Sequence, residues 1–531
     1  MLRRAIGYVL VIVGVLLIIL SWIKSYPVSV QPNGYLFGSI YFSYWIGLSA
    51  GNAGLFLVAS SSRRSIERFS CAVTFFVLAF SLRFFYSFVS GPDSDYFRGL
   101  IEYFLSTGSL LAQQQTYYQW PNLFILGAMT SEVLGLDGHA ISVVLFLVWS
   151  VSFAGLLFFY QKPKDSVADF LFIASYVIVP YAWLNWQFAA QTLALLLFVA
   201  CVDVLTKGDR TNLALGLILY ISLVLAHPFF ALFLVAATIP LILRDRRQVT
   251  LLFTFALIFV FYFVFETTLL VANVGQTLSS ILLFHQYSIA AGYILTTPFS
   301  PVDAAAQIVS RALVLSLGGL LGILLLWVIH ERKVRAIDLG IIFSGAVDLV
   351  AGAVLPYIGP RAFQVIMMPV ANVLRESALR KRVWQAIQVF MLLVLILFPV
   401  ALIHLQYADT NYMSLNEQRA AELILLPSYG TNSGENLTTV TRTIVDQYLG
   451  AKTPNAPHFM PERYGTAIVT DSSQIHFILD SPELGIALVT YGGYSPADLG
   501  RLHAVESAMS TIYSDGRVTV YWNEYQQNGT V

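Results

Sequence analysis

Long apolar runs recur along most of this sequence, and they constrain its fold more than any other feature. The first begins directly after Arg3 and Arg4 and continues to Ile23. A helix that crosses a bilayer needs about 20 mostly apolar residues, so the runs predict an all-α polytopic membrane protein with about 13 transmembrane helices. The predicted spans are residues 1–24, 36–60, 69–90, 139–160, 167–183, 187–206, 211–226, 228–243, 249–272, 304–329, 337–356, 362–375 and 384–405.

The small share of charged residues excludes several other classes of protein. Charged residues make up 11% of the chain and hydrophobic residues 57%, whereas soluble proteins usually carry about 25% charged residues. A soluble enzyme with an ordinary surface and a disordered chain are both excluded. The net charge of zero disfavours a partner made of nucleic acid. Cys71 and Cys201 both lie in apolar runs, so the sequence indicates no disulfide framework and no Cys/His metal pattern.

The two signs of charge are separated along the chain. From Gln406 to the end there are 13 acidic and 6 basic residues, and the preceding part has 24 basic and 17 acidic residues. This contrast predicts a membrane domain at 1–405 and a second domain at 406–531. The second domain is predicted to be a small α/β or α+β unit, with a helix at 415–426 and strands at 465–471 and 486–492. A hairpin is expected at 511–522, with its turn at Asp515-Gly516.

Clusters of Lys and Arg predict the topology, because short cytoplasmic loops of membrane proteins are enriched in both residues. An N-terminus in the cytoplasm places 19 of the 24 basic residues inside, in clusters at 3–4, 63–68, 162–164, 207–210, 244–247, 332–335 and 375–382. Residues 122–136 then form a helix that lies on the outer face without crossing the membrane. An odd number of spans makes the C-terminal domain extracytoplasmic.

Five basic residues remain, and this threading places all of them in the outer half of the membrane or outside it. They are Lys24, Arg83, Arg98, Arg311 and Arg361. Snorkelling to the interface is one interpretation of each arginine. The guanidinium group also matches the geometry of a phosphate, so Arg83, Arg311 and Arg361 are candidate ligands for a phosphate at the outer face.

The first long outer loop, 91–138, carries the best candidates for catalysis. Asp93 and Asp95 follow the third predicted span and precede an amphipathic segment that begins at Tyr96. One carboxylate of such a pair can accept a proton from an attacking hydroxyl, while the other orients a substrate or a metal. If a divalent metal binds, these two residues are its expected ligands. Two solvated loop carboxylates are the alternative interpretation.

Aromatic residues later in the same loop form a candidate sugar-stacking surface. Tyr117, Tyr118 and Trp120 lie close together in the sequence. Such residues also anchor proteins at the membrane interface, and both roles are open.

Two histidines belong to other outer segments. His285 lies in the second long outer loop, 273–301, which either covers a substrate or only connects two spans. His227 occupies a tight outer turn before Pro228. A histidine at this position can contact a phosphate or hydroxyl, or it can be purely structural.

These features together resemble a known superfamily. The acidic GPDSDYF segment at 91–97, the following YYQWPNLFILGAMTSEVLGLDGHAISVVLFLVWS segment at 117–150, and Arg361 before Pro369 are similar to the GT-C glycosyltransferases. The C-terminal STIYSDGRVTVYWN segment at 510–523 is also similar to the closing segments of prokaryotic members. The resemblance covers the membrane domain broadly and is strongest to the prokaryotic protein O-mannosyltransferase type.

The resemblance implies a membrane enzyme that takes a sugar from a polyprenyl- or dolichyl-phosphate donor. The acceptor would be a protein, lipid or glycan on the outer face, and the transfer would invert the anomeric centre. Asp93 or Asp95 would be the general base, and the phosphate would be bound among Arg83, Arg311, Arg361 and His227. Two features depart from the superfamily pattern. His139 stands near the position where many members carry an arginine, and two additional spans precede the usual first one.

Two other functional classes remain open at this point. A transporter or flippase would use ionisable residues within spans, and Asp348 lies in the middle of a predicted span. A non-catalytic assembly subunit with an outer sensing domain is the third class. Transfer that depends on Asp93 and Asp95 distinguishes the enzyme from both.

Overall fold

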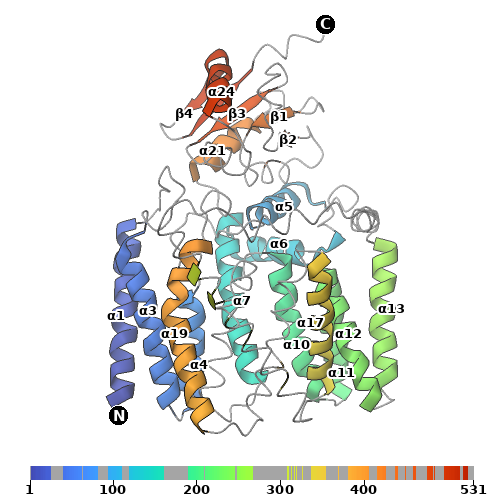
Figure 1. The fold of residues 1–531 in the computed structure, drawn as a ribbon. Coiled ribbons are helices and arrows are strands. Elements are labelled where there is room, and N and C mark those ends of the chain that lie inside the picture. The colour runs from blue at the N-terminus through green and yellow to red at the C-terminus, as the bar shows by residue number, and fades with distance from the viewer. Residues whose placement is uncertain are drawn as a thin grey trace.

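The computed structural model describes most of the helical domain and the secondary structure of the C-terminal domain (Figure 1). The described residues are 2–25, 40–62, 64–79, 81, 94–109, 119–160, 189–207, 210–244, 248–266, 308–309, 312–313, 316, 319, 326, 336–354, 369, 381–405, 415–425, 437–440, 449, 459–461, 475–481, 484, 496–514 and 518–523.

Twelve helices precede the C-terminal domain in the described part of the chain. They are α1 (Leu2–Ser25), α3 (Phe42–Ser61), α4 (Ser65–Ala79), α5 (Ser94–Thr107), α6 (Asn122–Leu134), α7 (Gly138–Tyr160), α10 (Ala190–Lys207), α11 (Arg210–Ala226), α12 (Pro228–Arg244), α13 (Gln248–Glu266), α17 (Ala336–Val354) and α19 (Lys381–Leu405). Ten of them coincide with predicted spans. The predicted spans at 167–183, 304–329 and 362–375 lie wholly or mostly outside the described residues.

Ten of these helices stand side by side as a bundle, while α5 and α6 lie across one end of it (Figure 1). The predicted outer-face helix at 122–136 is therefore a helix, α6, and it does lie at an end of the bundle. The N-terminus is at the opposite end, and the C-terminal domain lies beyond α5.

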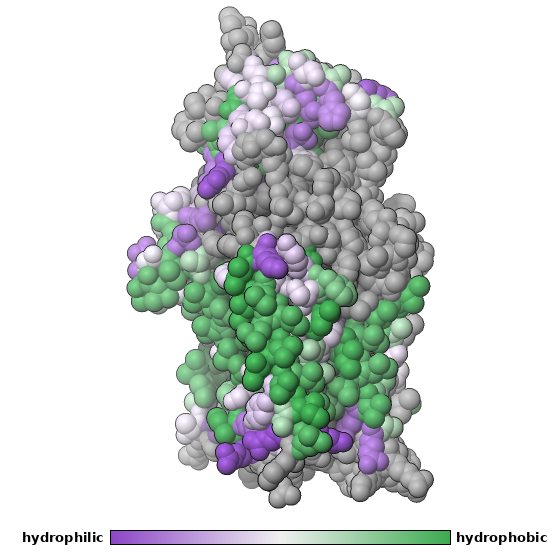
Figure 2. Space-filling view, turned by 90° about the vertical axis from the view of Figure 1, so that its left-hand side faces the viewer, coloured by the Kyte–Doolittle hydropathy of each residue, from purple (hydrophilic) through white to green (hydrophobic). Residues whose placement is uncertain are grey.

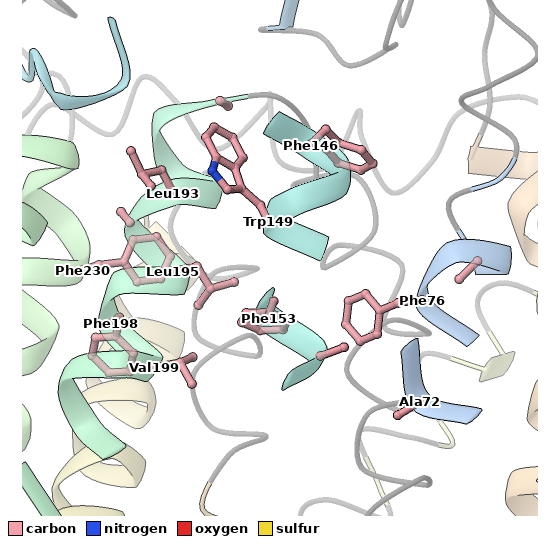
Figure 3. Close-up of a cluster of buried hydrophobic side chains, with 14 of the residues drawn as sticks. Ala72, Phe76, Phe146, Trp149, Phe153, Leu193, Leu195, Phe198, Val199 and Phe230 are labelled. Carbon is pink, nitrogen blue, oxygen red and sulfur yellow. The ribbon is translucent and has the colours of Figure 1, made fainter. Parts of the chain in front are cut away.

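Large aromatic side chains fill the centre of the bundle around α7 (Figure 3). Phe153 of α7 lies between Phe76 of α4 and the apolar face of α10, and its ring is 5.8 Å from that of Phe76. On the far side, Phe198 of α10 is 6.1 Å from Phe230 of α12. Continuous burial across four helices makes this part of the bundle a single core.

The first two helices join this core through closely packed glycines. A Cβ added to Gly14 of α1 would lie 2.6 Å from the backbone nitrogen of Gly51 in α3, and one added to Gly54 would lie 2.6 Å from the carbonyl oxygen of Gly7. Small residues allow two helix backbones to approach this closely. The glycines therefore determine the contact between α1 and α3.

A proline within α19 is accommodated by polar side chains of α3. Pro399 has no N–H group, so the carbonyl of Leu395 loses its donor within the helix. The Asn52 amide donates a hydrogen bond to this oxygen at 3.5 Å, and the Ser49 hydroxyl donates one to the carbonyl of Ile396 at 3.1 Å. A neighbouring helix thus supplies the donor that the proline removes.

The bundle exposes wide apolar surfaces (Figure 2). On α1, Val9, Ile12 and Ile23 are 58%, 58% and 65% exposed, and on α13, Phe253 and Leu257 are 69% and 70% exposed. Within the described part of the chain, α1 and α3 are long and apolar enough to cross a membrane, and eight further apolar helical stretches have 10 to 17 residues. Thirteen crossings stay a prediction.

Basic residues gather at the end of the bundle that holds the N-terminus. Arg4 and Tyr8 of α1 both donate hydrogen bonds to the carboxylate of Glu67 in α4, which also accepts one from Ser62. Helices α10 and α12 end at Lys207 and Arg244, and their successors begin at that same end (Figure 1). Hydrophilic residues accordingly rim the lower edge of the apolar surface (Figure 2).

The C-terminal domain is a mixed sheet with a helix on each face. Its elements are α21 (Leu415–Ile424), β1 (Leu437–Val440), β2 (Phe459–Pro461), β3 (Phe477–Asp480), α24 (Pro496–Ala508), β4 (Ser510–Ser514) and β5 (Thr519–Trp522). The strand order is β2-β1-β3-β5-β4, with β1 parallel to β2 and β3, and with β3, β5 and β4 antiparallel. An apolar cluster lies on each face of the sheet. Neighbouring residues of β3 point to opposite faces, so Phe477 packs on the α21 side and Ile478 packs on the α24 side.

The predicted helix at 415–426 and the predicted hairpin at 511–522 are confirmed as α21 and the β4–β5 pair. The strands predicted at 465–471 and 486–492 lie outside the described residues.

Candidate functional site

Helix α5 carries the first candidate residues across the end of the bundle, next to the C-terminal domain (Figure 1). The amphipathic pattern forms a helix from Ser94, with Phe97, Leu100 and Ile101 buried in the main core. Asp95 is the second residue of this helix. The buried face therefore holds α5 flat on the bundle and fixes the backbone at Asp95.

A buried arginine lies where α5 contacts the start of α7. Arg98 is 1% exposed, and its Nε lies 3.7 Å from Oε1 of Glu102, one turn further along α5. Both side chains pack against Gly138, the first residue of α7, where an added Cβ would lie 2.4 Å from Oε1 of Glu102 and 3.0 Å from Cγ of Arg98. Arg98 was predicted to lie in the outer half of the membrane or outside it, without a role of its own. The sequence feature that could have indicated a pair is the spacing of four residues between Arg98 and Glu102 on an otherwise apolar helix face.

Residues just before α6 tie this helix to the rest of the bundle. The Tyr262 hydroxyl of α13 donates a hydrogen bond to the carbonyl of Gln119, and the Asn122 amide donates one to the carbonyl of Ser222 in α11 at 2.9 Å. Between these two anchors, Trp120 is 5% exposed. The indole is thus buried in the bundle, and its role in binding a sugar stays a prediction.

His227 lies at the same end of the bundle, in the turn between α11 and α12. Its Nδ1 accepts a hydrogen bond from the backbone N–H of Phe229 at 3.2 Å, so the ring caps the start of α12. Because Nδ1 is the acceptor, the neutral ring carries its hydrogen on Nε2. His227 thus has a structural role at the start of α12, and its contact with a phosphate through Nε2–H stays a prediction.

The structure does not describe the positions of most of the other predicted site residues. Asp93, Arg83, Tyr117, Tyr118, His285, Arg311 and Arg361 lie outside the described residues. Asp348, the candidate of the transporter hypothesis, belongs to α17. Among the described residues, no group of three His, Cys, Asp or Glu side chains is arranged to hold a metal ion.

A second polar group lies in the C-terminal domain and was not predicted from the sequence. His503 and Glu506 of α24 are hydrogen-bonded, with 2.7 Å between Nδ1 and Oε2, and Glu506 is 4% exposed. The sequence feature that could have indicated this pair is its spacing of three residues, which places both side chains on one face of a helix. The partner strand that completes the group, β3, had not been predicted.

Comparison of the chain with known protein families and with curated proteins finds no match.

Proposed function

We propose that the chain is a polytopic membrane glycosyltransferase of the GT-C type, using a polyprenyl- or dolichyl-phosphate sugar as donor. The observation that carries the proposal is the position of α5. This helix begins at Ser94, between the two candidate aspartates, and its buried face, which includes Arg98, packs on the core of the bundle. A catalytic carboxylate needs such a fixed backbone.

The proposal places the bundle in a bilayer, with the N-terminus in the cytoplasm and the C-terminal domain outside. Its support is the exposed apolar surface of α1 and α13, since soluble monomers rarely expose apolar patches of this extent. The basic helix ends at the opposite end from α5 fit the enrichment of Lys and Arg on the cytoplasmic side. Labelling of Ala497→Cys, an exposed position on α24, by a membrane-impermeant thiol reagent in intact cells tests this orientation.

The chemistry is a single displacement at the anomeric carbon. The donor's prenyl tail lies in the bilayer and its phosphate lies at the outer interface. The acceptor oxygen forms a bond to the anomeric carbon while the bond from this carbon to the phosphate oxygen breaks. Asp93 or Asp95 takes the acceptor's proton. Cationic side chains from Arg83, Arg311 and Arg361, together with Nε2–H of His227, stabilise the departing lipid phosphate.

The proposal assigns the remaining residues to substrate binding. Tyr117, Tyr118 and Trp120 would line the sugar site, and His285 would approach it from the second loop. A divalent metal, if the reaction uses one, would be held by Asp93 and Asp95, whose oxygen ligands suit magnesium or calcium.

Transfer of label from a lipid-phosphate sugar tests the function. Membranes that contain the wild-type chain are expected to move labelled sugar from the lipid fraction to an acceptor, and Asp93→Asn or Asp95→Asn should abolish this transfer. Glu132→Gln is the matched control, because Glu132 is an exposed carboxylate on the neighbouring helix α6. Wild-type transfer by both Asp variants would exclude the assigned base. Transport of the lipid-linked sugar that depends on Asp348, without transfer, would instead establish the transporter class.

A further inference from the structure

The C-terminal domain contains a group of ionisable side chains between α24 and the sheet. His503 and Glu506 come from α24, Asp480 ends β3, and Tyr521 lies in β5. Ile478 is paired with Tyr521, and Asp480 is paired with Thr519. Because alternate residues of a strand share a face, Asp480 and Tyr521 lie on the same face as Ile478, which is the face that α24 covers.

Apolar contacts hold α24 to this face, and the ionisable group lies among them. Leu502 and Val505 of α24 pack with Ile478 and Tyr521. Glu506 directly follows Val505 and is 4% exposed, whereas the side chain of His503 is 68% exposed. The pair therefore joins a buried carboxylate to an imidazole that solvent can reach.

Only one oxygen of the buried Glu506 carboxylate has a hydrogen-bond partner among the described residues. Oε2 of Glu506 lies 2.7 Å from Nδ1 of His503, while Oε1 has no hydrogen-bond partner within the described part of the chain. A buried carboxylate that bears a full charge with one oxygen unsatisfied is costly. Protonation of the Glu506 carboxylate, or a positive charge on the His503 imidazole, removes most of this free-energy cost of burying the charge.

We propose that Asp480, His503 and Glu506 form a proton-operated latch that holds α24 on the sheet in mildly acidic solution and loosens it as the pH rises. When His503 loses its proton, the carboxylates of Asp480 and Glu506 remain at the interface, and the imidazole no longer carries the positive charge that offset them. The inference concerns the C-terminal domain alone and is independent of the proposed glycosyl transfer. A proton fits the group better than a metal does, because no described set of three ligands is arranged around an ion.

The pKa directions agree with this mechanism. Burial raises the pKa of Glu506 and of Asp480, and the hydrogen bond that the His503 imidazole donates to Glu506 raises the pKa of His503. Burial and the two carboxylates also raise the pKa of Tyr521. Each folded-state pKa lies above its unfolded value, so the docked form binds more protons. The stability that this group contributes is present below the unfolded pKa values and is lost as the pH rises, from near 4.5 for Glu506 to above 6.5 for His503.

Hydrogen exchange of the full chain in detergent, followed by mass spectrometry, measures the docking of α24. After correction for intrinsic exchange rates, peptides from 496–508 are expected to be severalfold better protected at mildly acidic pH than at mildly alkaline pH. Glu506→Gln keeps the shape of the protonated acid and carries no charge. It should therefore give high protection at both pH values, whereas His503→Gln should lower the protection at acidic pH to the alkaline level.

Two further variants complete the test. Asp480→Asn should raise protection at alkaline pH as Glu506→Gln does, and it carries the test if Glu506→Gln does not fold. Glu422→Gln alters an exposed carboxylate of α21 on the other face of the sheet and should retain the wild-type pH response. Equal protection of the wild-type α24 at both pH values would overturn the proposal, as would a wild-type pH response in both Glu506→Gln and Asp480→Asn.

Discussion

Gly138 is the residue at which the attachment of α5 is most sensitive to volume. It leaves room for the side chains of Arg98 and Glu102 at the start of α7. The preceding residue, Asp137, caps this helix by accepting a hydrogen bond from the N–H of Ala140 at 2.7 Å. A methyl group at Gly138 must displace the side chains of Glu102 and Arg98, which disturbs the packing of α5 on α7.

Gly138→Ala is therefore expected to lower the rate of sugar transfer and to destabilise the chain by about 1–3 kcal/mol, the usual cost of overpacking. Gly155→Ala is the matched control in the same helix, because its Cβ would lie 3.7 Å from Phe69, an ordinary contact distance. This control should leave transfer unchanged and stability equal or slightly higher, since alanine favours a helix. Thermal unfolding in detergent and the transfer assay measure both effects. Equal behaviour of the two variants would contradict the role given to Gly138.

The positions of the candidate site residues could be predicted from the sequence to different degrees. Asp95 and His227 were placed at one end of the bundle by charge patterning and by the alternation of apolar runs, and both lie there. Arg98 was predicted to lie in the outer half of the membrane or outside it. Its burial was not predicted, because burial of a guanidinium group depends on the fit between α5 and α7. The contact between α24 and β3 could not be predicted from the sequence either, since Asp480 and Glu506 are distant in the sequence.

At the level of elements, α3 and α19 depend on each other through Pro399. Asn52→Leu removes the donor to the carbonyl of Leu395 and should cost about 1–3 kcal/mol, because a buried carbonyl is left unsatisfied. In a Pro399→Ala background, residue 399 regains its N–H and can donate to the same oxygen. The cost of Asn52→Leu should then be clearly smaller. Denaturant unfolding of the four chains of this double-mutant cycle measures the difference, and equal costs in the two backgrounds would show that Asn52 does not compensate for the proline.

Most helices of the bundle could be predicted from the sequence, because a long apolar run leaves few alternatives to a helix. Helix α5 was predicted as an amphipathic segment, and its flat position follows from its buried Phe97 and Ile101. The C-terminal domain was less predictable. Strands β1, β2 and β3 have three or four residues each, and so short a stretch carries too little periodicity to distinguish a strand from a loop.

At the scale of the whole molecule, the proposed activity requires three parts to meet in one place. In the proposal, the bundle gives the donor's tail an apolar exterior, and the catalytic carboxylate is Asp93 or Asp95, from the segment at which α5 begins. The C-terminal domain lies over the same end of the bundle (Figure 1). In the proposed orientation, the basic helix ends at the end of the bundle opposite to α5 face the cytoplasm. The central claim is that the lipid phosphate binds at the end that carries α5.

A structure of the chain in lipid nanodiscs with an uncleavable polyprenyl-phosphate-sugar analogue tests this claim most directly. The account predicts that the bilayer surrounds the bundle, that the phosphate lies at the end bounded by α5, α6 and His227, and that the anomeric carbon is nearest to Asp93 or Asp95. An analogue bound at the end that holds Arg4 and Glu67, or in the middle of the bundle beside α17, would contradict it.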